Sequence, residues 1–157
     1  MRIGFGYDVH RLKAGRKCIL CGVEITSEFG PDGHSDADVP VHALMDSMLG
    51  ALALGDIGKH FPDNDDKWKN ADSIEMLKSV YAVVREMGYT LGNADVTIVL
   101  ESPRIAPYAE QMRETIACAL GTDIHRISVK ATTEERLGFT GDGSGISAYA
   151  VVLLQKS

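Results

Sequence analysis

Hydrophobic and polar residues alternate over the first segments of the chain, as they do in half-buried β-strands. Residues 2–12 alternate loosely and predict one strand. Residues 16–25 predict a second strand region, which Gly22 breaks into a hairpin or a bent ribbon. The tetrapeptide Gly30-Pro31-Asp32-Gly33 then predicts a turn before the first helix.

Three later segments repeat their apolar residues at helical spacing, and a glycine follows each of them. They span residues 40–54, 72–87 and 102–120. Pro40 opens the first, and Asp72 and Glu75 have the spacing of a capping box at the start of the second. Pro107 predicts a kink or a delayed start in the third.

Residues 93–100, 127–132 and 146–155 predict three further strands. The predicted succession is therefore β-β-α-α-β-α-β-β, which indicates the α/β (α+β) class, a mixed β-sheet with helices packed on one face. A chain of 157 residues is most simply one domain, and we predict a single domain over residues 1–157.

The formal charge of −6 argues against non-specific binding to nucleic acid, which draws on clustered Lys and Arg. It also means that an anionic ligand would need local cations or metal ions to offset the overall field. The sequence has no apolar run near the roughly 18 residues of a membrane span, and no basic-then-apolar leader at Met1. We therefore expect a cytoplasmic protein that binds neither nucleic acid nor membranes.

Asp8 and His10 lie two positions apart in a predicted strand, so they project from the same face. Together with His42, on the flank of the first helical stripe, they offer three zinc ligands and leave a fourth position open for water or substrate. Asp38 and Asp46 lie one turn either side of His42, and either could orient its imidazole. The alternative is an exposed aspartate and two unrelated histidines.

Three loops carry groups suited to a phosphate or a sugar. Residues 34–38 precede the first predicted helix, whose free backbone N–H groups could bind a phosphate. The alternative is that the Ser and Asp side chains of this loop only cap the helix. Residues 54–63 form a loop that glycines punctuate and that carries two carboxylates. These carboxylates could accept hydrogen bonds from the hydroxyl groups of a sugar or polyol, or the segment is only a solvated turn. Residues 130–141 run from the end of a predicted strand, where Thr hydroxyls could hold phosphate oxygens and Glu135 could bind a hard cation such as Mg²⁺. The alternative is that a Thr only caps a helical turn and that Glu135 is a surface carboxylate.

Five motifs from these regions stand in order along essentially the whole chain. They are Gly6-Tyr7-Asp8-Val9-His10, His34-Ser35-Asp36-Ala37-Asp38-Val39, Ala53-Leu54-Gly55-Asp56-Ile57-Gly58, Phe61-Pro62-Asp63, and Lys130-Ala131-Thr132-Thr133 through Gly138-Phe139-Thr140-Gly141. In these motifs the chain resembles the family of 2-C-methyl-D-erythritol 2,4-cyclodiphosphate synthases, which belong to the non-mevalonate route to isoprenoid precursors.

The resemblance implies a single catalytic domain that assembles as a homotrimer around a sheet-lined axis, with each active site between neighbouring subunits. Residues 148–154 are apolar on both faces, which fits burial between the sheet and a subunit contact. By the same resemblance, Asp8, His10 and His42 would hold Zn²⁺, and Glu135 would help bind Mg²⁺ or Mn²⁺ on the diphosphate.

The implied substrate is 4-diphosphocytidyl-2-C-methyl-D-erythritol 2-phosphate, whose 2-phosphate attacks the β-phosphorus and expels CMP. His34 and Thr133 would assist this metal-assisted intramolecular phosphoryl transfer. The contacts implied around the erythritol phosphate are His34, Ser35, Asp56, Gly58, Phe61, Pro62, Asp63, Asn64 and Asp65, with Asp8, His10 and Ile57 as further substrate contacts. The contacts implied for the cytidine diphosphate end are Leu100, Glu101, Ser102, Pro103, Arg104, Ile105, Ala106, Ala131, Thr132, Thr133, Glu134 and Glu135, with Phe139 as a further substrate contact.

Two positions depart from the family pattern. Glu134 stands where the family often has Thr, and it either alters metal affinity or faces water. Asp142 stands where several relatives have Arg. Relatives with that Arg enclose an apolar cavity on the trimer axis that can hold an isoprenoid diphosphate, so we expect three Asp side chains to weaken such binding. The alternative is that Asp142 faces solvent or pairs with Arg136.

Two other functions stay open on the residues alone. A zinc-dependent phosphoester hydrolase would release phosphate and close no ring. A nucleotide-binding regulatory trimer would use zinc structurally, and a fourth protein ligand would favour that role. The sequence places no further Cys or His beside the three-ligand set.

Overall fold

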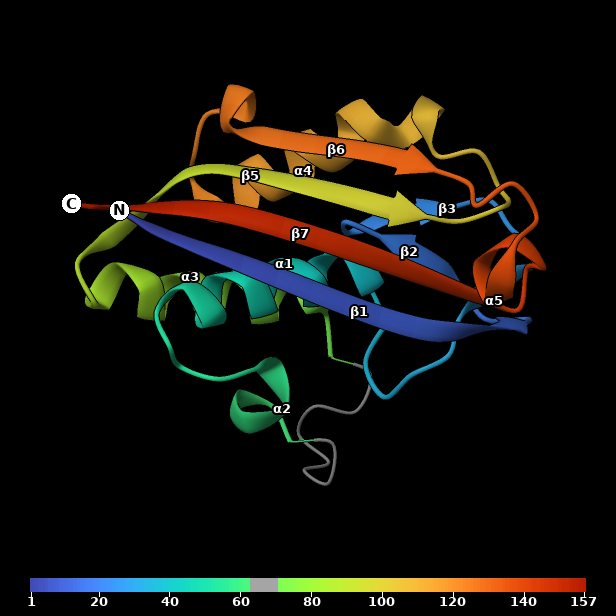
Figure 1. Ribbon diagram of the computed structural model, residues 1–157, viewed down its shortest axis with the longest axis horizontal. Coiled ribbons are helices and arrows are strands. Elements are labelled where there is room, and N and C mark those ends of the chain that lie inside the picture. The colour runs from blue at the N-terminus through green and yellow to red at the C-terminus, as the bar shows by residue number, and fades with distance from the viewer. Residues whose placement is uncertain (63–70) are drawn as a thin grey trace.

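A five-stranded mixed β-sheet organises the computed structural model, which describes residues 1–62 and 71–157 (Figure 1). Its strands, in spatial order, are β4 (Phe29–Pro31), β1 (Arg2–Ala14), β7 (Gly145–Lys156), β5 (Tyr89–Val99) and β6 (Ile127–Thr132). The β5–β6 pair is parallel and the other pairs are antiparallel. A separate hairpin joins β2 (Cys18–Leu20) to β3 (Val23–Ile25).

The longer helices cover one face of this sheet (Figure 1). They are α1 (Val39–Ala51), α3 (Ser73–Glu86) and α4 (Ala109–Leu120). Helix α1 packs against β1 and β7, and α3 lies beside α1 and α4. The short elements are α2 (Ile57–His60), α5 (Gly138–Gly141), and the 3₁₀ turns η2 (Ala106–Tyr108) and η3 (Ile124–Arg126). Among the described residues, no helix combines the length and apolar character that a membrane crossing requires.

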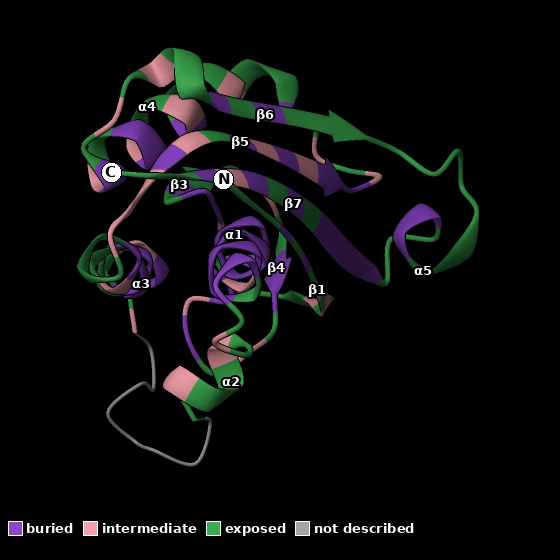
Figure 2. Cartoon of the chain, turned by 60° about the vertical axis from the view of Figure 1, so that its left-hand side comes forward, coloured by how far each residue is buried: buried purple, intermediate pink, exposed green. Residues whose placement is uncertain are grey.

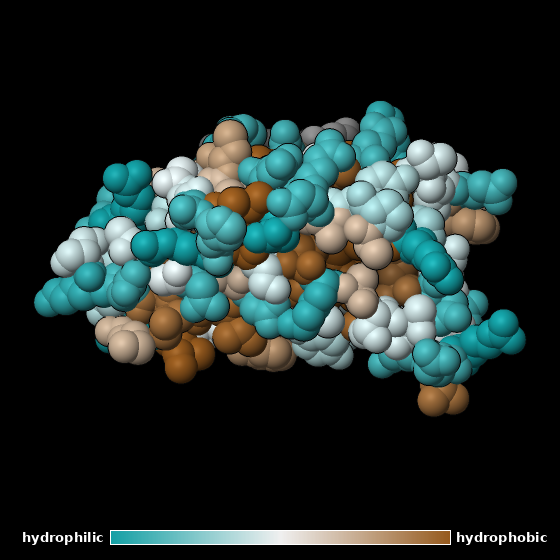
Figure 3. All heavy atoms as spheres, turned by 90° about the horizontal axis from the view of Figure 1, so that it is seen from above, coloured by the Kyte–Doolittle hydropathy of each residue, from teal (hydrophilic) through white to brown (hydrophobic). Residues whose placement is uncertain are grey.

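The two faces of the sheet differ in what covers them. On β7, Ala148, Ala150, Val152 and Leu154 are fully buried against the helices, and Figure 2 shows the buried α1 beneath the strands. The opposite face carries exposed apolar side chains, which we call the outer apolar face. Its members are Ile3, Phe5, Tyr7 and Val9 on β1, and Tyr149 and Val151 on β7. Figure 3 shows hydrophobic atoms reaching the molecular surface between polar ones.

Two glycines of β1 allow helix α1 to approach the sheet closely. A Cβ atom at Gly4 would lie 1.7 Å from the carbonyl oxygen of Ser47, and one at Gly6 would lie 1.9 Å from that of Ala43. Both oxygens belong to the backbone of α1, so no side-chain movement could relieve the overlap. The glycines therefore place the helix that carries His42 directly against the strand that carries Asp8 and His10.

We expect Gly6→Ala to destabilise the fold by about 1–3 kcal/mol or more, because the added methyl group must push α1 away from β1. Gly50→Ala is the matched control within α1. The nearest atom to a Cβ at Gly50 is 3.9 Å away, and alanine favours the helix by up to about 1 kcal/mol. Chemical denaturation of both variants measures the difference, and equal stabilities would contradict the close approach.

Most predicted elements are present, and their ends show where tertiary contacts override local pattern. Residues 30–33 were predicted as a turn, and this was wrong in part, because Phe29–Pro31 pairs with the end of β1 as an edge strand. Helix α1 ends before residue 54, since Ala53 takes a positive φ of 58° and Leu54 N–H closes onto the carbonyl of Leu49.

Other boundaries shift for similar reasons. Strand β5 begins at Tyr89, four positions before the predicted start, because it continues to pair with β7 past an irregularity at Gly92. The third helix is delayed, as Pro107 indicated, with the turn η2 preceding α4. The predicted succession of elements lacks β4 and the short helices, and it counts as one strand region the segment that forms the two strands β2 and β3.

Candidate active site

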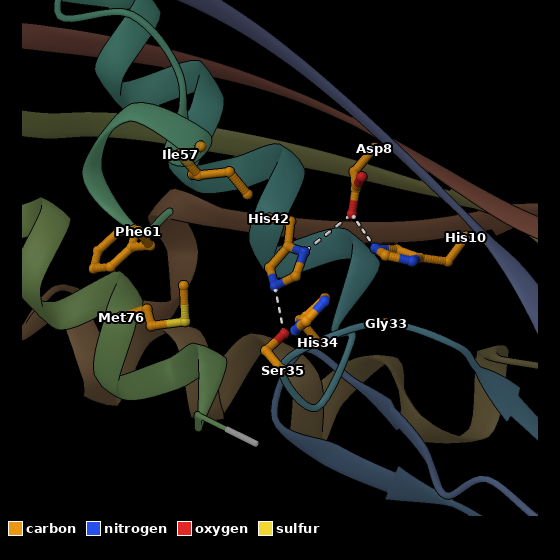
Figure 4. A pocket seen from close by; sticks show the side chains of 10 residues that line it. Asp8, His10, Gly33, His34, Ser35, His42, Ile57, Phe61 and Met76 are labelled. Atoms are coloured by element: carbon orange, nitrogen blue, oxygen red, sulfur yellow. Dashed lines mark hydrogen bonds and ion pairs between the residues drawn. The ribbon is translucent and has the colours of Figure 1, made fainter. Parts of the chain in front are cut away.

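Asp8, His10 and His42 converge at the junction of β1 and α1 (Figure 4). One donor atom from each side chain lies within 4.8 Å of the others. Asp8 Oδ2 is 3.4 Å from His10 Nε2 and 3.1 Å from His42 Nδ1. The alternation of β1 directs Asp8 and His10 to the helix side, and His42 meets them there from the first turns of α1.

The electrostatics of the cluster keep its carboxylate ionised. Burial raises the pKa of Asp8, but hydrogen bonds from His10 and His42 outweigh this and bring it to about 2. The same hydrogen bond with Asp8 is the main reason that the pKa of His10 is raised. Asp8 is therefore an anion at neutral pH, the form in which a carboxylate binds a metal ion.

A hydrogen bond to the backbone of Asp32 orients the imidazole of His10 toward the cluster. His10 Nδ1 lies 2.7 Å from the carbonyl oxygen of Asp32. A carbonyl only accepts, so Nδ1 carries a hydrogen and Nε2 is the ring nitrogen that faces Asp8. A metal-binding histidine is typically held in this way. The donor set of one carboxylate and two imidazoles therefore suits a divalent cation such as zinc.

The prediction that Asp38 or Asp46 orients His42 was wrong. Asp38 is fully buried and accepts hydrogen bonds from the N–H groups of Cys21 at 2.8 Å, Gly22 at 2.6 Å and Val41 at 3.3 Å. Burial raises its pKa to about 7. Asp38 thus ties the β2–β3 hairpin to the start of α1, while Asp46 accepts from the N–H of Ile57 at 2.7 Å.

Two serine hydroxyls occupy the place where those carboxylates were expected. His42 Nε2 lies 3.2 Å from Ser35 Oγ and 3.0 Å from Ser73 Oγ. Ser35 belongs to a predicted motif, but nothing in the sequence pattern singled out Ser73, which is the first residue of α3. Only the packing of α3 against α1 brings it to His42.

The cluster opens into a pocket of about 290 Å³. Several implied substrate contacts line this pocket, together with Gly33 and Met76, which the sequence did not indicate. The implied residues are Asp8, His10, His34, Ser35, Ile57, Gly58 and Phe61. Asp56 caps α2 beside it and accepts from the N–H of Lys59 at 3.1 Å. Pro62 is exposed, and Asp63, Asn64 and Asp65 lie outside the described residues.

Most of the implied nucleotide contacts gather in a second pocket, of about 420 Å³, but Glu134 and Glu135 do not line it. Leu100, Glu101, Pro103, Arg104, Ile105, Ala106, Ala131, Thr132 and Thr133 line it, with Ala109, Val129 and Lys130. Ser102 is not among its lining residues and borders a neighbouring hollow instead. Strands β1 and β6 are three positions apart in the sheet, which corresponds to about 14 Å at about 4.8 Å per strand. One chain therefore keeps the two groups of contacts apart.

The segment after β6 turns sharply and exposes its polar groups. The Thr133 hydroxyl donates to Glu135 Oε1 at 3.2 Å, and the Glu135 N–H donates to Thr133 Oγ1 at 3.3 Å. Glu135 has a positive φ of 52° and is exposed. Glu134 accepts a hydrogen bond from the Thr140 hydroxyl. Its carboxylate therefore has a protein partner as well as contact with solvent.

The last two predicted positions are also exposed. Phe139 keeps 45% of its surface accessible. Asp142 accepts from the N–H of Ser144 at 2.8 Å, and hydrogen bonding to the Ser144 side chain and then to this N–H lowers the pKa of Asp142. No ion pair between Asp142 and Arg136 occurs among the described residues. The weak binding of isoprenoid diphosphates stays a prediction.

Comparison with known proteins gives a consistent assignment. The sequence model of the YgbB family matches residues 1–155. The 2-C-methyl-D-erythritol 2,4-cyclodiphosphate synthase of Trichlorobacter lovleyi is 59% identical over 154 residues, which are 98% of this chain and 98% of that relative.

Solved structures agree with this over nearly the whole chain. A 2C-methyl-D-erythritol-2,4-cyclodiphosphate synthase in a CDP-bound form is 37% identical with a TM-score of 0.90, covering 98% of this chain and 100% of that one. The bifunctional IspDF from Campylobacter jejuni is 44% identical with a TM-score of 0.96, covering 99% of this chain and 42% of that one.

Proposed function

Because the chain belongs to the YgbB family, we propose that it converts 4-diphosphocytidyl-2-C-methyl-D-erythritol 2-phosphate to 2-C-methyl-D-erythritol 2,4-cyclodiphosphate and CMP. It is thus a CMP-releasing phosphorus–oxygen lyase of isoprenoid biosynthesis, and we place it in the cytoplasm. The observation that carries this is the 59% identity, across nearly all of both chains, to a synthase of that name. The convergence of Asp8, His10 and His42 in a pocket supports it independently.

In this reaction a bond forms between a 2-phosphate oxygen and the β-phosphorus, and the bond from that phosphorus to the α-phosphate oxygen breaks. The electron pair leaves with CMP. The nucleophile is already an anion, so no strong general base is required. The barrier lies in bringing two anionic groups together, and an oriented intramolecular attack can remove on the order of 7–11 kcal/mol of it.

We assign Zn²⁺ to Asp8, His10 and His42, and Mg²⁺ or Mn²⁺ to a site that includes Glu135. When bound, such cations supply Lewis-acid polarisation of phosphoryl oxygens and neutralise charge on the leaving side. The chain's own residues hold the substrate in place. Ile57, Phe61 and Met76 give the first pocket an apolar wall that limits water, and His34 and Thr133 would position the reacting phosphates.

The same assignment requires more than one subunit. The two groups of substrate contacts lie in separate pockets of one chain, while the outer apolar face leaves large side chains exposed to water. A homotrimer would cover that face and bring the nucleotide pocket of one subunit to the metal cluster of its neighbour. We therefore propose a homotrimer with sites between subunits.

Product analysis tests the function directly. The protein is incubated with the cytidine substrate and divalent cations, and phosphorus NMR is recorded over time. We expect signals of CMP and of a cyclic diphosphate to appear together. Inorganic phosphate without a ring would instead identify a phosphoester hydrolase, and binding without turnover would identify a regulatory nucleotide-binding protein.

Glu135→Gln should reduce turnover at limiting Mg²⁺ about tenfold to a hundredfold, because an oxygen ligand loses its charge, a change of about 1.5–3 kcal/mol. Zinc content should not change. Titrating activity with Mg²⁺ measures the shift. Glu114→Gln, at an exposed position on α4, is the control for loss of one carboxylate. An unaltered Mg²⁺ requirement in Glu135→Gln would make Glu135 a surface carboxylate only.

A further inference from the structure

Ser73 connects the candidate metal cluster to a carboxylate that the function above does not use. Ser73 is fully buried at the start of α3, and its hydroxyl donates to Asp36 Oδ1. Its backbone N–H donates to Asp36 Oδ2 at 3.1 Å. Asp36 is itself held, since its N–H donates to the carbonyl of Ala71 at 3.2 Å. Both carboxylate oxygens of Asp36 therefore engage the same residue.

This arrangement determines which way the Ser73 hydroxyl points. A hydroxyl has one hydrogen, and an ionised carboxylate only accepts. The hydrogen of Ser73 is thus committed to Asp36, and the Ser73 oxygen presents its lone pairs to His42 Nε2, 3.0 Å away. The only favourable contact there is donation from His42 Nε2–H to Ser73 Oγ.

Ser35 alone would not impose this choice. Its oxygen lies 3.2 Å from His42 Nε2 and accepts the N–H of Ala37 at 3.0 Å. Its own hydrogen can rotate toward a bare Nε2, or away from a protonated one. Asp8 pulls in the opposite direction, because its carboxylate would accept a hydrogen from His42 Nδ1. The hydrogen on Nε2 is therefore secured by Ser73 and Asp36.

We propose that Asp36 and Ser73 are positioning residues for the metal site: they keep the hydrogen of His42 on Nε2, so that Nδ1 can be the ligand. This rests on the metal site proposed above. The carboxylate acts on the histidine through a serine hydroxyl, in the role that a directly bonded carboxylate plays at many zinc sites.

Asp36→Asn tests the direction of the hydroxyl with almost no change in shape. The Ser73 N–H donates to Asp36 Oδ2 at 3.1 Å, and the N–H of Asp38 donates to Oδ1 at 3.3 Å. The amide oxygen of Asn therefore favours the shorter contact with the Ser73 N–H, and its NH₂ then faces Ser73 Oγ. The Ser73 hydrogen then turns toward His42 Nε2, which favours a hydrogen on Nδ1 and blocks that ligand. We expect the zinc dissociation constant to rise about 10–100-fold.

The control is Asp72→Asn, which removes the same charge at the same end of α3. Asp72 caps the helix by accepting from the N–H of Ile74 at 2.8 Å. Its zinc affinity, measured like that of Asp36→Asn by competition with a chromogenic chelator, should equal that of the wild type. Nitrogen-15 NMR of the histidine rings gives a second measurement in the metal-free protein. Nε2 of His42 should be protonated in the wild type and in Asp72→Asn, and bare in Asp36→Asn.

An Asp36→Asn protein with wild-type zinc affinity and a protonated Nε2 would overturn the proposal. If that variant does not fold, Ser73→Ala decides, because it removes only the hydroxyl; unchanged zinc affinity in Ser73→Ala would likewise overturn it. A wild-type protein that binds no zinc would refute the metal site itself. The ring-nitrogen shifts of the metal-free proteins would then still show whether Asp36 and Ser73 determine the protonation of Nε2.

Discussion

Replacing His42 by alanine is expected to abolish turnover and to lower zinc content sharply. His42 is the only member of the three-residue cluster that comes from α1, and its ring lies buried between Asp8, Ser35 and Ser73. Two ligands from one strand would remain, one fewer than the three protein ligands of an ordinary catalytic zinc site. A loss of about 4 kcal/mol of transition-state stabilisation corresponds to at least about a thousandfold in rate.

Metal analysis and steady-state kinetics of the same preparation measure both effects. His125→Ala is the matched control, because His125 is exposed in the turn η3 and donates no ligand to the cluster. Light scattering should show that both variants keep the oligomeric state of the wild type. Full zinc occupancy with near-normal activity in His42→Ala would remove the assignment of this residue.

The sequence indicates part of the cluster by local geometry alone. The two-residue period of a strand puts Asp8 and His10 on one face, and the structure has them there. The meeting with His42 is not a local property. It depends on how closely α1 approaches β1, which Gly4 and Gly6 permit through backbone contacts that no periodicity reveals. The sequence offered His42 as a candidate ligand from the flank of a helical stripe, with unrelated histidines as the alternative, and the resemblance then implied that the three residues form one zinc set.

The supporting hydrogen bonds were harder to predict, and the failure has a physical cause. Asp38 and Asp46 were chosen because helical spacing puts them near His42. Each carboxylate instead accepts N–H groups from another segment, the β2–β3 turn for Asp38 and the start of α2 for Asp46. Ser73 reads in sequence as an ordinary first residue of a helix. Its contact with His42 depends on packing between helices that are far apart along the chain.

Strand β4 shows the same limit in the fold. Gly30 and Pro31 have strong turn preferences, and three residues are too short for a visible alternation. Pairing with Leu12, Lys13 and Ala14 nevertheless makes this segment an edge strand. Long elements with a regular period were predicted well, while elements defined by a distant partner were not.

The second large effect is expected at the outer apolar face. Phe5→Asp should convert the proposed trimer to a monomer and remove its activity. Phe5 is 62% exposed in a single chain and lies beside Val151, with its ring 6.2 Å from that of Tyr149. An exposed side chain can be replaced without loss of the core, so the monomer should stay folded. In the trimer, three unpaired carboxylates would each be buried at a penalty of several kcal/mol.

Met87→Asp separates this effect from a general effect of added charge. Met87 is 46% exposed at the end of α3, away from the outer apolar face, and its variant should remain an active trimer. Light scattering gives the mass of each protein, and circular dichroism shows whether Phe5→Asp is folded. A folded Phe5→Asp monomer without activity is the expected result, because each chain alone keeps its metal cluster and its nucleotide pocket in separate places. Full activity in a monomer, whether mutant or wild type, would mean that one chain completes the site and that the outer apolar face has another role.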